Sequence, residues 1–142
     1  MYSHGMIAPV LALAAWTFVM WVWLYAVRIP AMRKAKIDVQ KAELQGPGAI
    51  TQLPRAAQRP AENYNHLHEQ PTVFYAIALA AQIAGAAEPI AIGLAWTYVA
   101  LRIVHSLIQA TANIIMARFL IFMVATLVLI ALLVRVAWSV FL

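Results

Sequence analysis

The stretch MIAPVLALAAWTFVMWVWLYAV, residues 6–27, runs for 22 residues without a charged side chain. About 20 apolar residues in a helix cross a hydrocarbon core about 30 Å thick, so this stretch predicts a transmembrane helix. Aromatic side chains gather from its middle onward, at Trp16, Trp21, Trp23 and Tyr25, as is typical close to a membrane interface. The positive charges follow the apolar run and do not precede it, which disfavours a cleaved signal peptide.

The composition of the whole chain agrees with a membrane protein. Of its 142 residues, 65% are hydrophobic and 11% are charged, whereas soluble domains contain about 25% charged residues. One small globule cannot bury so much apolar surface, so the excess is expected to face lipid. The chain has no cysteine, which excludes disulfides, thiolate metal ligands and a catalytic cysteine. We therefore expect an all-α membrane protein with a single domain over residues 1–142.

Three further apolar segments follow, so we predict a bundle of four transmembrane helices. The second segment, residues 72–87, is too short for a full span, so its helix is expected to begin near Pro60, because proline suits a first helical turn. Pro71 is expected to kink or loosen that helix, and Pro30 to stop the first one. The predicted spans are about 6–29, 60–87, 90–115 and 118–138, with a loop over residues 30–59.

The loop between the first two spans is long and basic. It holds most of the positive charge, since seven of the ten lysines and arginines lie from Arg28 to Arg59. The positive-inside rule places this loop in the cytoplasm, and four spans then place both termini on the opposite side. Gly46-Pro47-Gly48 is expected to break any helix within it.

Two interpretations of this loop remain open, a solvated or interfacial loop and a site for lipid headgroups. The net charge of +5 is better explained by topology than by nucleic acid, so no nucleic-acid partner is expected.

Polar side chains inside a membrane helix are costly and indicate function by default. Two stripes of such residues recur at helical spacing, close to the end that faces the cytoplasm. The first stripe is Arg59, Asn63, His66 and Gln70, flanked by Glu62 and Glu69, and the second is Arg102, His105, Ser106, Gln109 and Asn113. Arg118 opens the fourth span at the same end.

The stripes allow two interpretations. They hold the bundle together through hydrogen bonds to each other, or they form an anion-binding cleft. In the second case arginines bind carboxylates and amides bind amides; the candidates are Arg59, Arg102, Arg118, Asn63 and Gln109.

Other chemistries are disfavoured by spacing. His66, His68 and Glu69 lie close together with His105 as a further ligand, but His66 and His68 at i and i+2 project from different faces of a helix, so no metal is expected. A Ser–His–acid hydrolase is disfavoured because Ser106 and His105 are adjacent and do not converge. Residues 6–27 of the first span carry no charged group, unlike small four-helix multidrug transporters, which carry a glutamate there.

Two stretches resemble a known family. Residues 59–75, RPAENYNHLHEQPTVFY, resemble the second-helix signature of the MAPEG family, the membrane-associated proteins in eicosanoid and glutathione metabolism. Residues 98–106, YVALRIVHS, together with Asn113 and Arg118-Phe119, resemble the third helix and following loop of its bacterial branch.

The resemblance implies a homotrimer of four-helix protomers in a bacterial inner membrane, with glutathione bound between protomers near the cytoplasmic face. It implies a glutathione transferase or peroxidase that acts on hydrophobic electrophiles or lipid hydroperoxides. The alternative is a non-catalytic scaffold or accessory subunit of the same fold.

The family motif Arg-x-x-x-Asn-x-x-Glu can be placed in two registers. Arg59 and Asn63 match its first two positions with His66 in place of Glu, or Glu69 matches its last position with Glu62 and His66 before it. On the third helix, His105 and Gln109 stand where enzymes of the leukotriene-synthase type have tyrosines.

By this resemblance, Arg118 lowers the pKa of the glutathione thiol and His105 assists as a base, since imidazole titrates near neutral pH. The implied glutathione-binding residues are Arg59, Asn63, His66, Glu69, Arg102, Gln109, Asn113 and, from a neighbouring protomer, Arg28.

Overall fold

Three long helices dominate the computed structural model, which describes residues 4–46 and 48–142. They are α1 (Ile7–Lys34), α6 (Pro89–Ala110) and α7 (Ile115–Phe141), and each is long and apolar enough to cross a membrane. With 28, 22 and 27 residues at about 1.5 Å per residue, all three exceed the hydrocarbon thickness. Over the described residues the chain forms helices and no strand, as predicted for an all-α membrane protein.

The second predicted span is divided into two helices, α4 (Arg55–His66) and α5 (Gln70–Ile83). The prediction that this segment begins near Pro60 was wrong, because Pro54 already caps the first turn and Pro60 lies inside α4. The break falls at residues 67–69, just before Pro71. Pro71 therefore occupies the first turn of α5, where a missing backbone N–H leaves no helical bond unmade.

The prediction that Pro30 stops the first helix was also wrong, since α1 continues to Lys34. Pro30 removes one helical hydrogen bond, the one to the carbonyl of Ala26. Both residues are exposed, and α1 packs along α4, so the loss is tolerated.

Helices α1 and α5 end in the same Schellman motif, with different residues at its left-handed position. After α1, Lys36 has φ 52°, and Ile37 N donates to Met32 O at 3.1 Å. After α5, Gly85 has φ 72°, and Ala86 N donates to Ala81 O at 2.8 Å. Glycine adopts this conformation without a steric penalty, whereas lysine does not.

Other boundaries also shift. The predicted loop 30–59 holds two short helices, α2 (Val39–Gln45) and α3 (Gly48–Thr51). They are separated at Gly46, as the Gly-Pro-Gly sequence predicted, although Pro47 lies outside the described residues. Helix α6 ends five residues earlier than the predicted boundary at 115, and α7 continues beyond 138 to Phe141.

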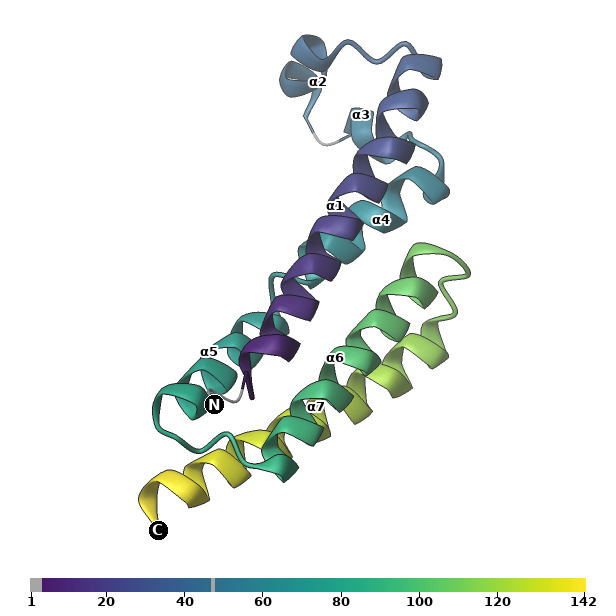
Figure 1. Cartoon of the computed structure of the whole chain (residues 1–142). Helices are drawn as coiled ribbons and strands as arrows, with labels where there is room; N and C mark the ends of the chain where they lie inside the picture. Colours follow the sequence, from purple (N-terminus) through teal and green to yellow (C-terminus); the bar gives the residue numbers. More distant parts are fainter. Residues whose placement is uncertain (1–3, 47) are drawn as a thin grey trace.

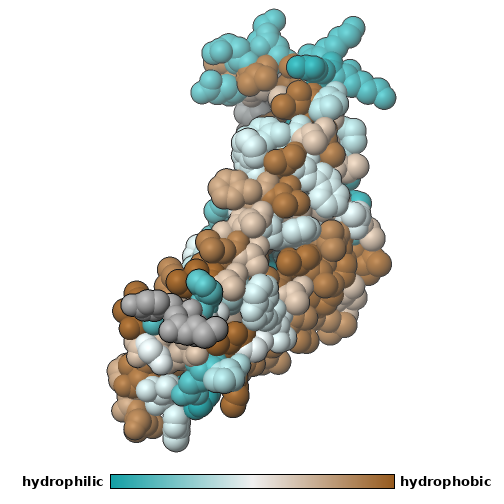
Figure 2. Space-filling model, in the orientation of Figure 1, coloured by the Kyte–Doolittle hydropathy of each residue, from teal (hydrophilic) through white to brown (hydrophobic). Residues whose placement is uncertain are grey.

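The helices pack as two main pairs, α1 along α4 and α6 along α7, with α1 also touching α5 and α6. The start of α1 and the end of α7 lie at one end of the bundle, and α2 and α3 lie at the other (Figure 1). The buried core includes Leu13, Met20, Phe74, Tyr98 and Leu132. Hydrophilic side chains gather around α2 and α3, and hydrophobic ones cover much of the bundle (Figure 2).

Candidate functional site

One face of α6 carries four buried polar side chains toward α4. Arg102, His105, Ser106 and Gln109 follow at i, i+3, i+4 and i+7, and each is at most 2% exposed. Asn63 of α4 is fully buried as well. We call these five residues the buried polar cluster. The prediction that polar stripe residues turn inward is confirmed for these five.

Two arginines tie α4 to α6 through backbone carbonyls. Arg102 Nη2 donates to His66 O at 3.1 Å, and Arg59 Nη1 donates to Thr111 O, just beyond the end of α6, at 2.6 Å. These bonds lie at the two ends of the α4–α6 contact, which aligns the helices antiparallel. Part of each stripe therefore holds the bundle together.

Much of the hydrogen-bonding capacity of the buried polar cluster is unused. Among the described residues, no partner is present for both amide atoms of Asn63, Ser106 Oγ and Gln109 Oε1, nor for Arg102 Nε and Nη1 and His105 Nδ1. A buried polar group without a partner costs about 1–3 kcal/mol, and native proteins contain few of them. A cluster kept only for packing would leave fewer.

A pocket of about 360 Å³ adjoins this cluster at the start of α7. Its polar wall is formed by His66, His105 and Arg118, and its apolar wall by Ile115, Phe119 and Phe122. The ring centroids of His66 and His105 are 5.4 Å apart in a T-shaped arrangement. Phe122 connects the pocket to the cluster, with its ring 5.6 Å from that of His66 and 5.9 Å from Arg102 Cζ.

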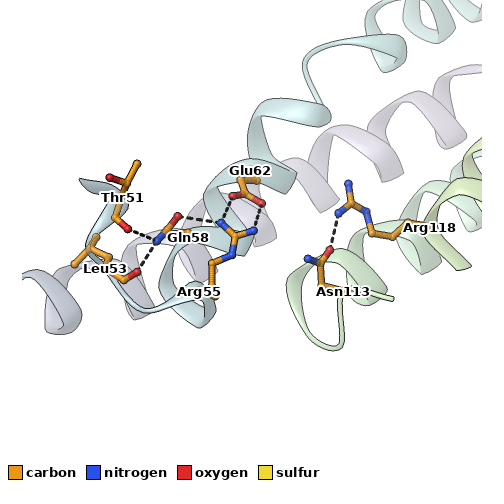
Figure 3. Close-up of polar contacts among 7 residues, drawn as sticks. All are labelled: Thr51, Leu53, Arg55, Gln58, Glu62, Asn113 and Arg118. Carbon is orange, nitrogen blue, oxygen red and sulfur yellow. Dashed lines mark hydrogen bonds and ion pairs between the residues drawn. The ribbon is translucent and has the colours of Figure 1, made fainter. Parts of the chain in front are cut away.

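Arg118 is held at the pocket by the α6–α7 turn. Its Nη1 donates to Asn113 Oδ1 at 2.5 Å (Figure 3). Asn113 has φ 52°, a left-handed conformation that asparagine tolerates better than most residues. The turn thus presents an amide oxygen that orients the guanidinium.

The predicted site residues fall into three groups. His66, His105 and Arg118 line the pocket, whereas Asn63, Arg102 and Gln109 are buried in the polar cluster and do not line it. The third group lies outside the pocket and consists of Arg28, Arg59, Glu69 and Asn113.

Within that third group, the surroundings differ. Glu69 is exposed, with Oε2 3.2 Å from His66 Nδ1. Arg28 lines a separate hollow of about 220 Å³ between α1 and the outer side of α4, together with Asn65 and Glu62. Glu62 is paired with Arg55 at 2.9 Å (Figure 3). The single chain therefore does not bring Arg28 to Arg118.

Sequence reasoning missed the apolar wall of the pocket, because it singled out polar residues alone. Ile115, Phe119 and Phe122 recur at helical spacing around Arg118, and that periodicity was the available signal. Within the described ranges, no group of three or more metal-ligating side chains comes together.

A comparison with protein-family models matches residues 6–138, nearly the whole chain, to the MAPEG family. Comparisons with curated proteins and with solved structures found no match.

Proposed function

Because the chain belongs to the MAPEG family, we propose that it is a membrane-bound glutathione transferase or peroxidase whose pocket at the start of α7 holds the glutathione thiol. The observation that supports this best is Arg118 beside His66 and His105 in a pocket with one polar and one aromatic wall. The substrates proposed are hydrophobic electrophiles or lipid hydroperoxides that enter from the bilayer along Ile115 and Phe119.

Arg118 activates the thiol in this proposal. A free cysteine thiol has a pKa of about 8.5, and a neighbouring guanidinium favours the charged thiolate. His105 Nδ1, buried and without a partner among the described residues, can receive the thiol proton. The chain needs no cysteine of its own, because glutathione supplies the sulfur.

Two residues outside the pocket suit the remainder of the tripeptide. The exposed carboxylate of Glu69, beside His66, suits the ammonium group of glutathione. The guanidinium of Arg28 suits a carboxylate, but it lines a different side of the chain. We therefore propose that Arg28 acts on glutathione bound to a neighbouring protomer of a homotrimer.

The other predicted ligands have supporting roles in this proposal. Arg102 has its Cζ 5.9 Å from the Phe122 ring in the pocket wall, and Gln109 follows His105 by one turn of α6. Both have polar atoms that lack partners among the described residues. Arg59 donates to Thr111 O, and Asn113 accepts from Arg118 Nη1 and so orients that guanidinium. Both residues therefore act through the α6–α7 turn.

The proposed topology counts α4 and α5 together as a second crossing, which makes four. The 30–59 segment then faces the cytoplasm of a bacterium, and both termini face away from it. The arrangement of the ends supports this, since α1 starts and α7 finishes at the same end of the bundle (Figure 1).

A non-catalytic scaffold of the same fold is the second candidate. It is favoured by Arg59 and Arg102, which both donate to backbone carbonyls of their own chain. In that case arginine substitution loosens the assembly and there is no thiol chemistry to lose.

The test is a glutathione titration of the purified full-length protein, read by the ultraviolet absorption of the thiolate as a function of pH. We expect saturable binding at millimolar glutathione and a lowered thiol pKa, both reduced in Arg118→Ala. Arg33→Ala, which removes an exposed arginine far from the pocket, is the matched control. If the folded protein shows no saturable binding, the enzymatic proposal fails and the non-catalytic scaffold is the better description.

A further inference from the structure

We propose that the segment after α1 forms a binding site for the headgroup phosphate of an anionic phospholipid, independent of the glutathione pocket. A hollow of about 280 Å³ lies between the end of α1, the start of α2 and α3. Lys36, Lys41 and Gln52 line it, together with Asp38. Two ammonium groups and an amide donor around one hollow are suited to the oxygens of a phosphate.

The backbone at Lys36 supports a role for its side chain. Lys36 holds the left-handed position of the Schellman motif, with φ 52°, where the equivalent residue after α5 is Gly85. A strained conformation retained at a position that glycine would occupy more easily indicates a functional constraint. The function in this case is to place the Lys36 ammonium group at the rim of the hollow.

The cations around the hollow are available for a ligand. Of the ion pairs in the described part of the chain, none involves Lys36 or Lys41. The acid in the hollow, Asp38, is engaged as the N-cap of α2, where Oδ1 accepts from Gln40 N at 3.0 Å. An incoming phosphate therefore meets two free ammonium groups and one carboxylate that is already hydrogen-bonded.

The hollow lies at the outer edge of the headgroup layer, within reach of lysine side chains. Taking Arg28 as the edge of the hydrocarbon, Lys34 lies six residues further along α1, or about 9 Å beyond it. The headgroup layer is about 5–8 Å thick on each side, and lysine side chains can extend back toward it. Val39 and Leu44 on α2 are 68% and 87% exposed, and these apolar side chains suit an interface better than bulk water.

The charge of the whole segment matches an anionic surface. Lys36 and Lys41 are joined by Arg33 and Lys34, so four basic residues follow the span within nine positions. Clusters of four or more directly after a transmembrane helix attract anionic lipids. Figure 2 shows hydrophilic side chains gathered at this end of the molecule.

The experiment measures lipid selectivity of the full-length protein in phosphatidylcholine vesicles, using spin-labelled phosphatidylglycerol and spin-labelled phosphatidylcholine as probes. Electron paramagnetic resonance reports the fraction of each label that the protein immobilises. We expect the wild type to prefer the anionic label. Lys36→Gly and Lys41→Gln should each lower that preference by up to about fivefold at low salt, and Lys36→Arg should restore it.

Arg33→Gln is the matched control, because it removes one exposed charge of the same segment outside the hollow. It should lower the preference less than Lys36→Gly or Lys41→Gln does, because it contributes only to the diffuse charge of the segment. Lys36→Gly also removes the steric strain of the left-handed backbone, so the melting temperature of this variant should not fall. Lys41→Gln leaves the backbone of α2 unchanged.

Three results would overturn the proposal. In the first, the wild type immobilises both labels equally. In the second, Arg33→Gln lowers the preference as much as Lys36→Gly, which means a diffuse charge effect without a site. In the third, inorganic phosphate at matched ionic strength displaces the lipid label, which means that the hollow takes a soluble anion.

Discussion

Two polar groupings lie toward opposite ends of the α6–α7 helix pair, and they differ in how far their hydrogen bonds are satisfied. At the end where α5 connects to α6, Glu88 pairs with Arg135 of α7 and accepts from Ser139 Oγ at 3.1 Å. We call these three residues the Glu88 clamp. Both of its carboxylate oxygens have partners, although Arg135 Nε has none among the described residues.

Toward the other end of this pair, several atoms of Asn63, Arg102 and Gln109 in the buried polar cluster have no partner within the described part of the chain. The contrast separates two uses of polar residues in a membrane bundle. A paired group fastens helices together, whereas an unpaired buried group is costly unless something else binds to it. Substitutions at the clamp should therefore affect stability, and substitutions at the cluster and pocket should affect ligand binding.

The largest effect is expected from Arg118→Ala, which removes the pocket guanidinium. Loss of one preorganised group that stabilises developing negative charge lowers turnover by about 10²–10³-fold. We expect this loss in the turnover number of Arg118→Ala for conjugation of glutathione to a hydrophobic electrophile. The melting temperature of the variant should equal that of the wild type. Arg118→Lys, which keeps the charge, should recover part of the rate, and a rate equal to the wild type in Arg118→Ala would assign the chemistry elsewhere.

Arg102→Leu tests the buried polar cluster directly. Leucine removes the bond from Arg102 Nη2 to His66 O, but that carbonyl still accepts from Glu69 N at 3.3 Å, and the two guanidinium nitrogens that lack partners among the described residues are removed as well. The protein should therefore stay folded, while glutathione affinity falls about tenfold through the loss of a charged donor. The titration of the two proteins side by side, with melting curves, measures both quantities. If unfolding accompanies the loss of binding, the arginine serves the bundle and the contrast with the clamp fails.

Glu88→Ala should have the opposite pattern. It leaves Arg135 and Ser139 without their acceptor, and the expected loss of stability is about 1 kcal/mol, because both partners of the ion pair are about one-third exposed. Thermal unfolding in detergent measures this loss. Glu88→Gln, which keeps one acceptor oxygen and removes the charge, should lose less stability than Glu88→Ala, and glutathione affinity should be the same in all three proteins.

The smallest effect is expected from Asn113→Gly. Glycine tolerates φ 52° but offers no side-chain oxygen to Arg118, so stability should be retained and turnover should fall less than tenfold. Steady-state kinetics should place the change in kcat and not in KM for the second substrate. A larger loss than in Arg118→Ala would give Asn113 a direct role.

The sequence predicted the features that depend on local composition and period. Apolar runs identified α1, α6 and α7 as membrane helices, and the helical spacing from Arg102 to Gln109 correctly predicted one inward face. Both features follow from the cost of exposing charge to lipid. The sequence of a single helix is enough to show which of its faces avoids that cost.

The remainder depended on contacts between distant segments. The bond from Arg59 to Thr111 joins residues 52 positions apart, and the Glu88–Arg135 pair joins residues 47 apart, so neither has a local signal. The break before Pro71 and the continuation of α1 past Pro30 depend on packing and exposure, which proline alone does not decide.

The central claim is that the pocket at the start of α7 binds glutathione, and an experimental structure of the assembled protein with glutathione added tests it most directly. We predict density for the tripeptide between protomers, with its sulfur beside Arg118 and His105 and a carboxylate near Arg28 of a neighbouring copy. A well-resolved pocket without density at saturating glutathione, or glutathione bound at another place, would contradict the account.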